Sequence, residues 1–110
     1  MSARRLRSDI RASALLRRAQ GAGAFATLLR RGEASAGALH VVVRTPDGRA
    51  QLFSPIRNMA GEPAWLASTP LPEAEIDAKL TRLADRDPDL WCVEIEDREG
   101  RHFLLEPIED

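Results

Sequence analysis

With 110 residues, the chain has the length of one ordinary domain, and its composition of 44% hydrophobic and 30% charged residues excludes a disordered chain. The net charge of -1 excludes a uniformly basic or acidic protein. The single cysteine, Cys92, excludes an intrachain disulfide, and no apolar stretch approaches the ~20 residues of a membrane span. We expect one domain over residues 1–110, with a mobile basic segment at 1–7. The basic start lacks the apolar run of a signal peptide, so we also expect a cytoplasmic protein.

The first predicted element is a helix over residues 8–20, which Ser8 or Asp9 can cap and Gly21 can end. At 100° per residue, four arginines fall in one narrow sector opposite a broad apolar face. This arginine stripe comprises Arg4, Arg7, Arg11 and Arg18. It can contact phosphate or an acidic partner, since guanidinium pairs bidentately with such groups. The more ordinary interpretation is a solvated face whose side-chain stems cover apolar surface.

Several strands are predicted to follow. Residues 24–31 (AFATLLRR) predict a strand, although their leucines and alanines also allow a helix. Residues 38–44 contain three consecutive valines, which suit a pleated strand. The Thr-Pro-Asp-Gly sequence at 45–48 predicts a tight turn into a partner strand at 49–54. Residues 65–68 predict a short edge strand.

A second helix is predicted to begin at Pro72, because proline suits the first helical position. Acidic residues occupy its first turn, where the helix dipole stabilises negative charge. Four apolar residues then follow the spacing of a core-facing stripe. They are Ile76, Leu80, Leu83 and Ala84.

Residues 89–106 (DLWCVEIEDREGRHFLLE) predict a β-hairpin. Trp91, Val93 and Ile95 alternate onto one apolar face, which we assign to the core against the second helix. Gly100 supplies the positive φ of the turn, and residues 101–106 form the return strand.

The predicted fold class is α+β, in the order α-β-β-β-(β)-α-β-β. Short turns between consecutive strands indicate a mostly antiparallel sheet, a meander plus the C-terminal hairpin. We expect a two-layer domain with both helices on one face.

The net charge conceals a division between the halves of the chain. Residues 1–58 carry eleven arginines against three acidic residues, for a net +8, and residues 59–110 carry five basic against fourteen acidic residues, for a net -9. The halves either neutralise each other within one fold or present opposite signs to partners.

Carboxylates are the residues here most suited to a metal. Glu94 and Glu96 share one strand face about 7 Å apart, a spacing that with a third carboxylate suits Mg²⁺ and would support a metal-dependent hydrolase. The alternative is salt bridging with the basic half. His40 and His102 lack partners at zinc-ligand spacing, and Cys92 is best interpreted as a small buried residue. We assign no catalytic residue, metal or cofactor.

Two segments, residues 13–32 (SALLRRAQGAGAFATLLRRG) and residues 87–104 (DPDLWCVEIEDREGRHFL), resemble the domain of unknown function 1491 family. The resemblance runs over nearly the whole chain. It implies a short, single-domain alphaproteobacterial protein of the cytoplasm, with no established activity, ligand or catalytic residue.

The leading hypothesis is a non-enzymatic interaction module that binds a protein partner or itself. The alternatives are a nucleic-acid-associated protein, which would use the arginine stripe against phosphate, and the Glu94/Glu96 hydrolase. We expect a homodimer through an unprotected apolar edge at residues 65–68 or 103–105, weakened by added salt, and no membrane partner.

Overall fold

The computed structural model describes residues 6–110, so the predicted mobile segment lies mostly outside the described residues. The helices are α1 (Ser8–Gly21) and α2 (Glu73–Arg86). The strands are β1 (Phe25–Arg30), β2 (Leu39–Arg44), β3 (Arg49–Arg57), β4 (Pro63–Ala67), β5 (Leu71–Pro72), β6 (Trp91–Glu96) and β7 (Ile108–Glu109). Across the described residues, neither helix is long and apolar enough to cross a membrane.

All strands join one mixed sheet in the order β1-β6-β2-β3-β4-β7, with β5 pairing to β3. Most pairs are antiparallel, but β6 runs parallel to β2, and β7 runs parallel to β4. The α+β class, the two helices and the mostly antiparallel sheet are therefore confirmed. The 45–48 turn is also confirmed, with Gly48 at φ 80° between β2 and β3.

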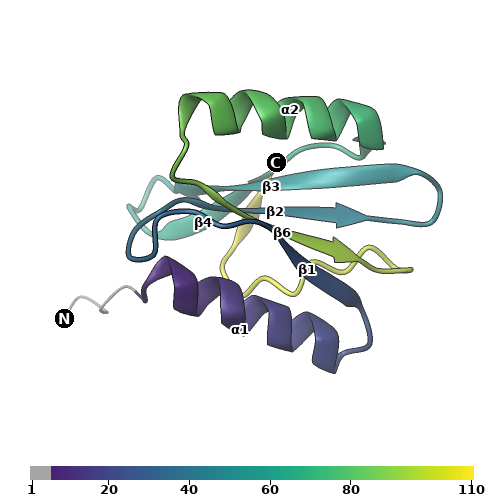
Figure 1. Ribbon diagram of the computed structural model, residues 1–110, viewed down its shortest axis with the longest axis horizontal. Helices are drawn as coiled ribbons and strands as arrows, with labels where there is room; N and C mark the ends of the chain where they lie inside the picture. Colours follow the sequence, from purple (N-terminus) through teal and green to yellow (C-terminus); the bar gives the residue numbers. More distant parts are fainter. Residues whose placement is uncertain (1–5) are drawn as a thin grey trace.

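The two helices cover opposite faces of the sheet, with α2 above and α1 below in Figure 1. The prediction that both lie on one face is wrong. Trp91, Val93 and Ile95 are buried, as predicted, but they pack with Leu15 of α1. The apolar stripe of α2, which includes the fully buried Ile76, packs against the other face of the sheet. That face comprises Val42, Ala50, Leu52, Leu90 and Cys92.

The physical reason lies in the central strands, β2 and β6, which are apolar on both faces. Val41 and Val43 face α1 while Val42 between them faces α2. Such a strand exposes apolar surface on whichever face no helix covers, so the sheet needs a helix on each side.

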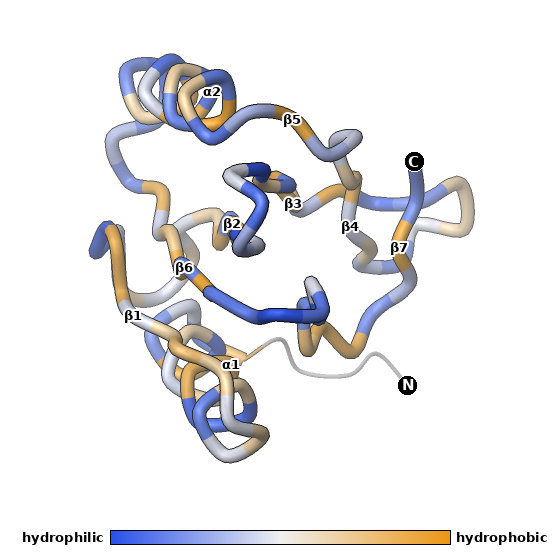
Figure 2. Tube along the Cα trace, turned by 90° about the vertical axis from the view of Figure 1, so that its right-hand side faces the viewer, coloured by the Kyte–Doolittle hydropathy of each residue, from blue (hydrophilic) through white to orange (hydrophobic). Residues whose placement is uncertain are grey.

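The predicted C-terminal hairpin does not form. β6 already pairs with β1 on one edge and β2 on the other, so no edge remains for a return strand. Phe103 adopts φ 61°, outside the extended region. Residues 101–107 instead lead to the edge of the sheet opposite β1, where β7 pairs with β4 (Figure 2).

Candidate functional site

The arginine stripe of α1 is largely engaged by the protein itself. Arg4 lies outside the described residues. Arg7 pairs with Asp9 at 3.3 Å, and the Arg11 guanidinium carbon lies 5.8 Å from the centre of the Trp65 ring. Arg18 donates a hydrogen bond to the carbonyl of Phe103 at 3.1 Å. The stripe therefore covers the C-terminal segment and Trp65, which reduces the surface that it offers to a phosphate backbone.

Glu94, one of the two candidate metal ligands, accepts a 2.7 Å hydrogen bond from Arg44 Nε. Asp77 and Glu73 of α2 bind the other guanidinium nitrogens of Arg44, at 2.7 and 3.5 Å. Burial opposes the charge of Arg44, but the hydrogen bonds to Asp77 and Glu94 hold its pKa above the ordinary value. The basic and acidic halves of the chain thus meet at this ion-pair cluster.

Glu96 is exposed on the same strand face as Glu94. Within residues 6–110, no group of three His, Cys, Asp or Glu side chains could hold a metal ion. A guanidinium occupies the place beside Glu94 that a cation would need, which argues against the hydrolase hypothesis.

The remaining reactive side chains are buried at Cys92 and His40 and half-buried at His102. Burial raises the pKa of the Cys92 thiol to about 12, so the nucleophilic thiolate is absent at neutral pH. Burial also lowers the pKa of His40, whose Nδ1 lies 3.1 Å from Ser54 Oγ. His102 Nδ1 accepts a hydrogen bond from the Leu104 amide at 2.9 Å. Within this set, a possible nucleophile meets a base at the Ser54 hydroxyl beside the buried His40 ring.

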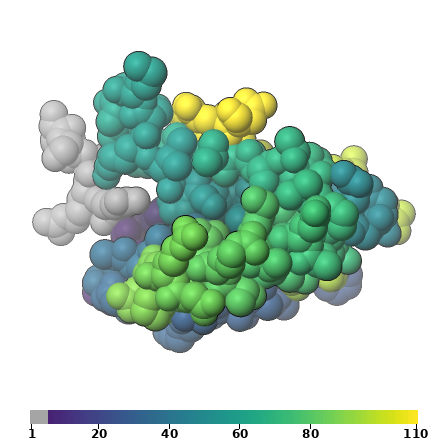
Figure 3. Space-filling model, turned by 90° about the horizontal axis from the view of Figure 1, so that it is seen from above, coloured from purple at the N-terminus to yellow at the C-terminus, as the bar shows by residue number. Residues whose placement is uncertain are grey.

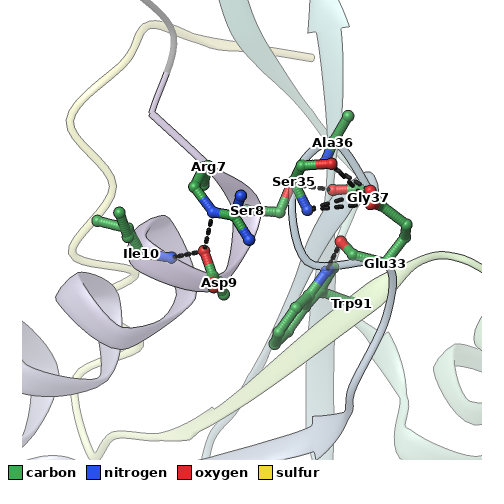
Figure 4. A network of polar contacts seen from close by, with 9 residues as sticks. All are labelled: Arg7, Ser8, Asp9, Ile10, Glu33, Ser35, Ala36, Gly37 and Trp91. Carbon is green, nitrogen blue, oxygen red and sulfur yellow. Dashed lines mark hydrogen bonds and ion pairs between the residues drawn. The ribbon is translucent and has the colours of Figure 1, made fainter.

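A polar network joins the start of α1 to the loop at residues 32–37 (Figure 4). Ser8 does not cap the helix, as had been predicted. Its hydroxyl instead donates to the Gly37 carbonyl at 2.6 Å. Trp91 Nε1 donates to the Glu33 carbonyl at 2.6 Å, and the Glu33 carboxylate accepts from the Ser35 hydroxyl, also at 2.6 Å. The Ser35 hydroxyl and nearby amides lower the pKa of Glu33. The loop is therefore fixed on both sides.

Gly37 has no room for a side chain, because an added Cβ would meet the Asp89 carbonyl oxygen at 2.3 Å. Gly32 is just as close to the backbone of Asp89 and Leu90, which precede β6. Both glycines let the loop pack directly on the backbone that leads into β6.

An open cleft of about 450 Å³ lies beside this loop, between the start of α1 and β3. Its walls are polar and apolar in nearly equal measure, and Arg11 and Arg57 are the charged side chains that line it among the described residues. The lining is Leu6, Ser8, Arg11, Ser35, Ala36, Gly37, Ala38, Leu39, Pro55, Ile56 and Arg57. We call this the Arg11–Arg57 cleft.

A second surface lies at the edge of the sheet formed by β1. Within the described residues, β1 pairs only with β6, so its other edge has no neighbouring strand. Phe25 is 76% exposed, Leu29 47% and Leu28 37%, and Ile10 of the adjacent α1 is 48% exposed. These four residues are called the β1-edge surface below. A groove of about 370 Å³ between α1 and β1 includes Ile10 and Leu28 in its lining.

Sequence reasoning placed the unprotected edges elsewhere. Residues 65–68 were expected at an edge, but β4 lies between β3 and β7 and pairs with both. The signal for the true edge was present in residues 24–31, where large apolar residues occupy both faces of a strand. The sequence pattern does not say which strand ends the sheet.

The family model described as Protein of unknown function (DUF1491) matches residues 6–105. The chain belongs to this family. It is similar to the crystal structure of a DUF1491 family protein from Caulobacter crescentus CB15, with 48% identity, a TM-score of 0.90 and coverage of 96% of this chain and 100% of that one. An NMR structure of a DUF1491 family protein from the same organism gives 46% identity and a TM-score of 0.88, covering 98% and 100%.

A solution structure of a protein from A. tumefaciens is 34% identical over 94% of this chain and 97% of that one, with a TM-score of 0.76. A search of curated proteins gives no match. The family resemblance seen in the sequence is therefore confirmed. The family description assigns no function.

Proposed function

We propose that this chain is a small, non-enzymatic interaction module of the cytoplasm that binds polypeptide, either a protein partner or a second copy of itself, along the β1 edge. The observation that carries the proposal is the exposure of Phe25, Leu28 and Leu29 on a strand with one unpaired edge. The free Cys92 fits a reducing compartment.

The physical basis is that an edge strand presents unpaired N–H and C=O groups, and proteins usually protect such edges with charge, proline or a covering segment. Between Phe25 and Leu29 the strand has no charge and no proline, although Gln20 Nε2 donates a hydrogen bond to the Ala26 carbonyl at 3.0 Å. An added strand would gain main-chain hydrogen bonds, and its side chains would cover the apolar residues.

The register shift between Leu28 and Arg30 sets a limit on this pairing. A bulge bends its strand and interrupts regular hydrogen bonding. An incoming strand should therefore pair along residues 25–28, with the groove between α1 and β1 receiving a side chain beyond that stretch.

Two observations favour binding over the other hypotheses. Arg44 neutralises Glu94, which weakens the case for a hydrolase. Arg11 and Arg18 contact Trp65 and the Phe103 carbonyl, which weakens the case for a nucleic-acid surface.

Site-specific photo-crosslinking tests the proposal. A photoreactive phenylalanine analogue at position 25 should give a discrete adduct in cells, because Phe25 would lie within contact distance of the partner. The matched control places the analogue at Leu66, which is 47% exposed on β4. The adduct mass separates a second copy from a different protein. Absence of adducts at position 25, or equal adducts at position 66, would overturn the proposal.

A further inference from the structure

The Arg11–Arg57 cleft has the composition of a binding site for an anion that carries an apolar group. Among the described residues, its lining includes two guanidinium groups and no carboxylate, in a protein whose carboxylates slightly outnumber its cations. Its volume, about 450 Å³, lies within the range of small-ligand pockets. We propose that this cleft binds a carboxylate attached to an apolar body.

The polar groups of the cleft define which end of a ligand they can hold. The hydroxyl protons of Ser8 and Ser35 are committed to Gly37 and Glu33. Arg57 carries guanidinium N–H groups beyond the one that Gly61 accepts, so the polar end of a ligand held there is an acceptor. A guanidinium presents N–H groups in a planar fork that matches a carboxylate.

Arg57 is restrained by the neighbouring turn. Its Nη1 donates to the Gly61 carbonyl at 2.7 Å, which holds the side chain against the β3–β4 turn. The Arg11 guanidinium lies beside the Trp65 ring. Both positions fix the direction of a positive charge that would otherwise move freely on a long side chain.

The walls determine the rest of the ligand. Leu39 is buried at the base, and Pro55, Ile56 and Leu6 line the sides. An inorganic anion would leave these walls in contact with water, whereas an aliphatic group would cover them. The shared chemistry is found at the C-terminus of a peptide with an apolar last residue and in a free aliphatic acid.

This site is separate from the surface in the proposed function. The cleft shares no lining residue with the β1-edge surface, and it lies between α1 and β3, away from β1. Either proposal can therefore fail without the other.

The test is a titration of the ¹⁵N-labelled full chain followed by NMR. N-acetyl-leucine represents a peptide C-terminus and hexanoate a free acid, and each has a matched amide, N-acetyl-leucinamide or hexanamide. We expect the acids at millimolar concentration to shift the amide signals of residues 35–38 and 56–57. The amides should bind at least about tenfold more weakly, because they lack the charge that strengthens a guanidinium hydrogen bond.

The relative affinity of the two acids identifies the source of the ligand. No shift at these signals with either acid, or equal binding of acids and amides, would overturn the proposal.

Variants locate the binding. Ala36→Glu places a carboxylate at the exposed cleft wall and should abolish binding by repulsion, while Ala36→Gln, of the same size, should retain it. Arg57→Gln should weaken binding at least about tenfold. Arg82→Gln on α2 is the matched control and should change nothing. Equal binding by the Glu and Gln variants at position 36 would contradict the assignment.

Discussion

The two edges of the sheet are protected very differently. At one edge, β1 offers six residues with Phe25, Leu28 and Leu29 exposed. At the other, β4 is covered by the two-residue strand β7. Figure 2 shows β1 and β7 on opposite sides of the molecule, and in Figure 3 the C-terminal residues lie at one side of the face that α2 covers.

The covered edge is held by side chains from distant parts of the sequence. Trp65 donates its indole N–H to the Glu106 carboxylate at 2.8 Å, and its amide donates to the Pro107 carbonyl at 2.9 Å. Arg18 holds the Phe103 carbonyl. The last ten residues thus close one edge of the sheet, and within residues 6–110 no segment covers β1 in the same way. This difference between the two edges is the basis for our proposal that the open edge binds polypeptide.

The largest expected loss of stability comes from truncating Trp65, the side chain that anchors the covered edge. Trp65 is 2% exposed and packs in the core under α1. Trp65→Ala should lower the free energy of unfolding by about 3–5 kcal/mol, because it leaves a cavity and releases the Glu106 contact. Urea denaturation measures this, with Leu66→Ala on the same strand as the control. Similar losses for both variants would show that the β4 edge is not anchored through Trp65.

A smaller effect is expected from the carboxylate that holds Trp65. Burial would raise the pKa of Glu106, but the Trp65 hydrogen bond and the nearby Arg11 and Arg18 hold it below the ordinary value. Glu106→Ala should cost about 1–3 kcal/mol and speed hydrogen exchange at the Trp65 amide. Glu109→Ala, on exposed β7, should do neither. An unchanged exchange rate in the Glu106 variant would mean that the segment stays docked without this bond.

The start of the covering segment gives a pH-dependent prediction. Arg101 donates to both carboxylate oxygens of Asp97 and lowers the pKa of Asp97 from 3.8 to about 2. Since the folded pKa is depressed, the pair stabilises the fold above pH ~4 and is lost as pH falls toward 2. An NMR titration of the Asp97 carboxyl carbon should show this midpoint, and Arg101→Gln should raise it toward about 3.9. An unshifted midpoint in the variant would assign the effect to the backbone amides.

Most elements of the fold follow from local signals in the sequence. The 45–48 turn, the burial of Trp91 and the stripe on α2 all depend on neighbours in sequence. The placement of one helix on each face could have been inferred from Val41, Val42 and Val43. Three consecutive buried residues in a strand need cover on both faces of the sheet.

Pairing between distant strands could not be predicted in the same way. The parallel pairing of β6 with β2 takes both edges of β6, and this excludes a hairpin that residues 97–100 would otherwise permit. Gly100 does adopt the predicted positive φ, at 73°. The local turn was therefore recognised correctly, while the position of the chain after it depended on which strand edges were already occupied. The Arg11–Arg57 cleft was missed for the same reason, since its walls come from α1, β2 and β3.

The smallest expected effect is at the open edge. Phe25→Ser should change the free energy of unfolding of the monomer by no more than about 0.5 kcal/mol, because the ring is 76% exposed and loses little buried area. Its neighbour Ala26 is 6% exposed and faces α1. Ala26→Ser should cost about 1–3 kcal/mol, since it buries a hydroxyl without a partner.

Unfolding of both variants should be measured at low and high protein concentration. If a second copy covers β1, the cost of Phe25→Ser should grow with concentration, because self-association stabilises only the folded wild type. A cost equal to that of Ala26→Ser at low concentration would show that Phe25 is already covered within one chain, and the β1 edge would then resemble the β4 edge.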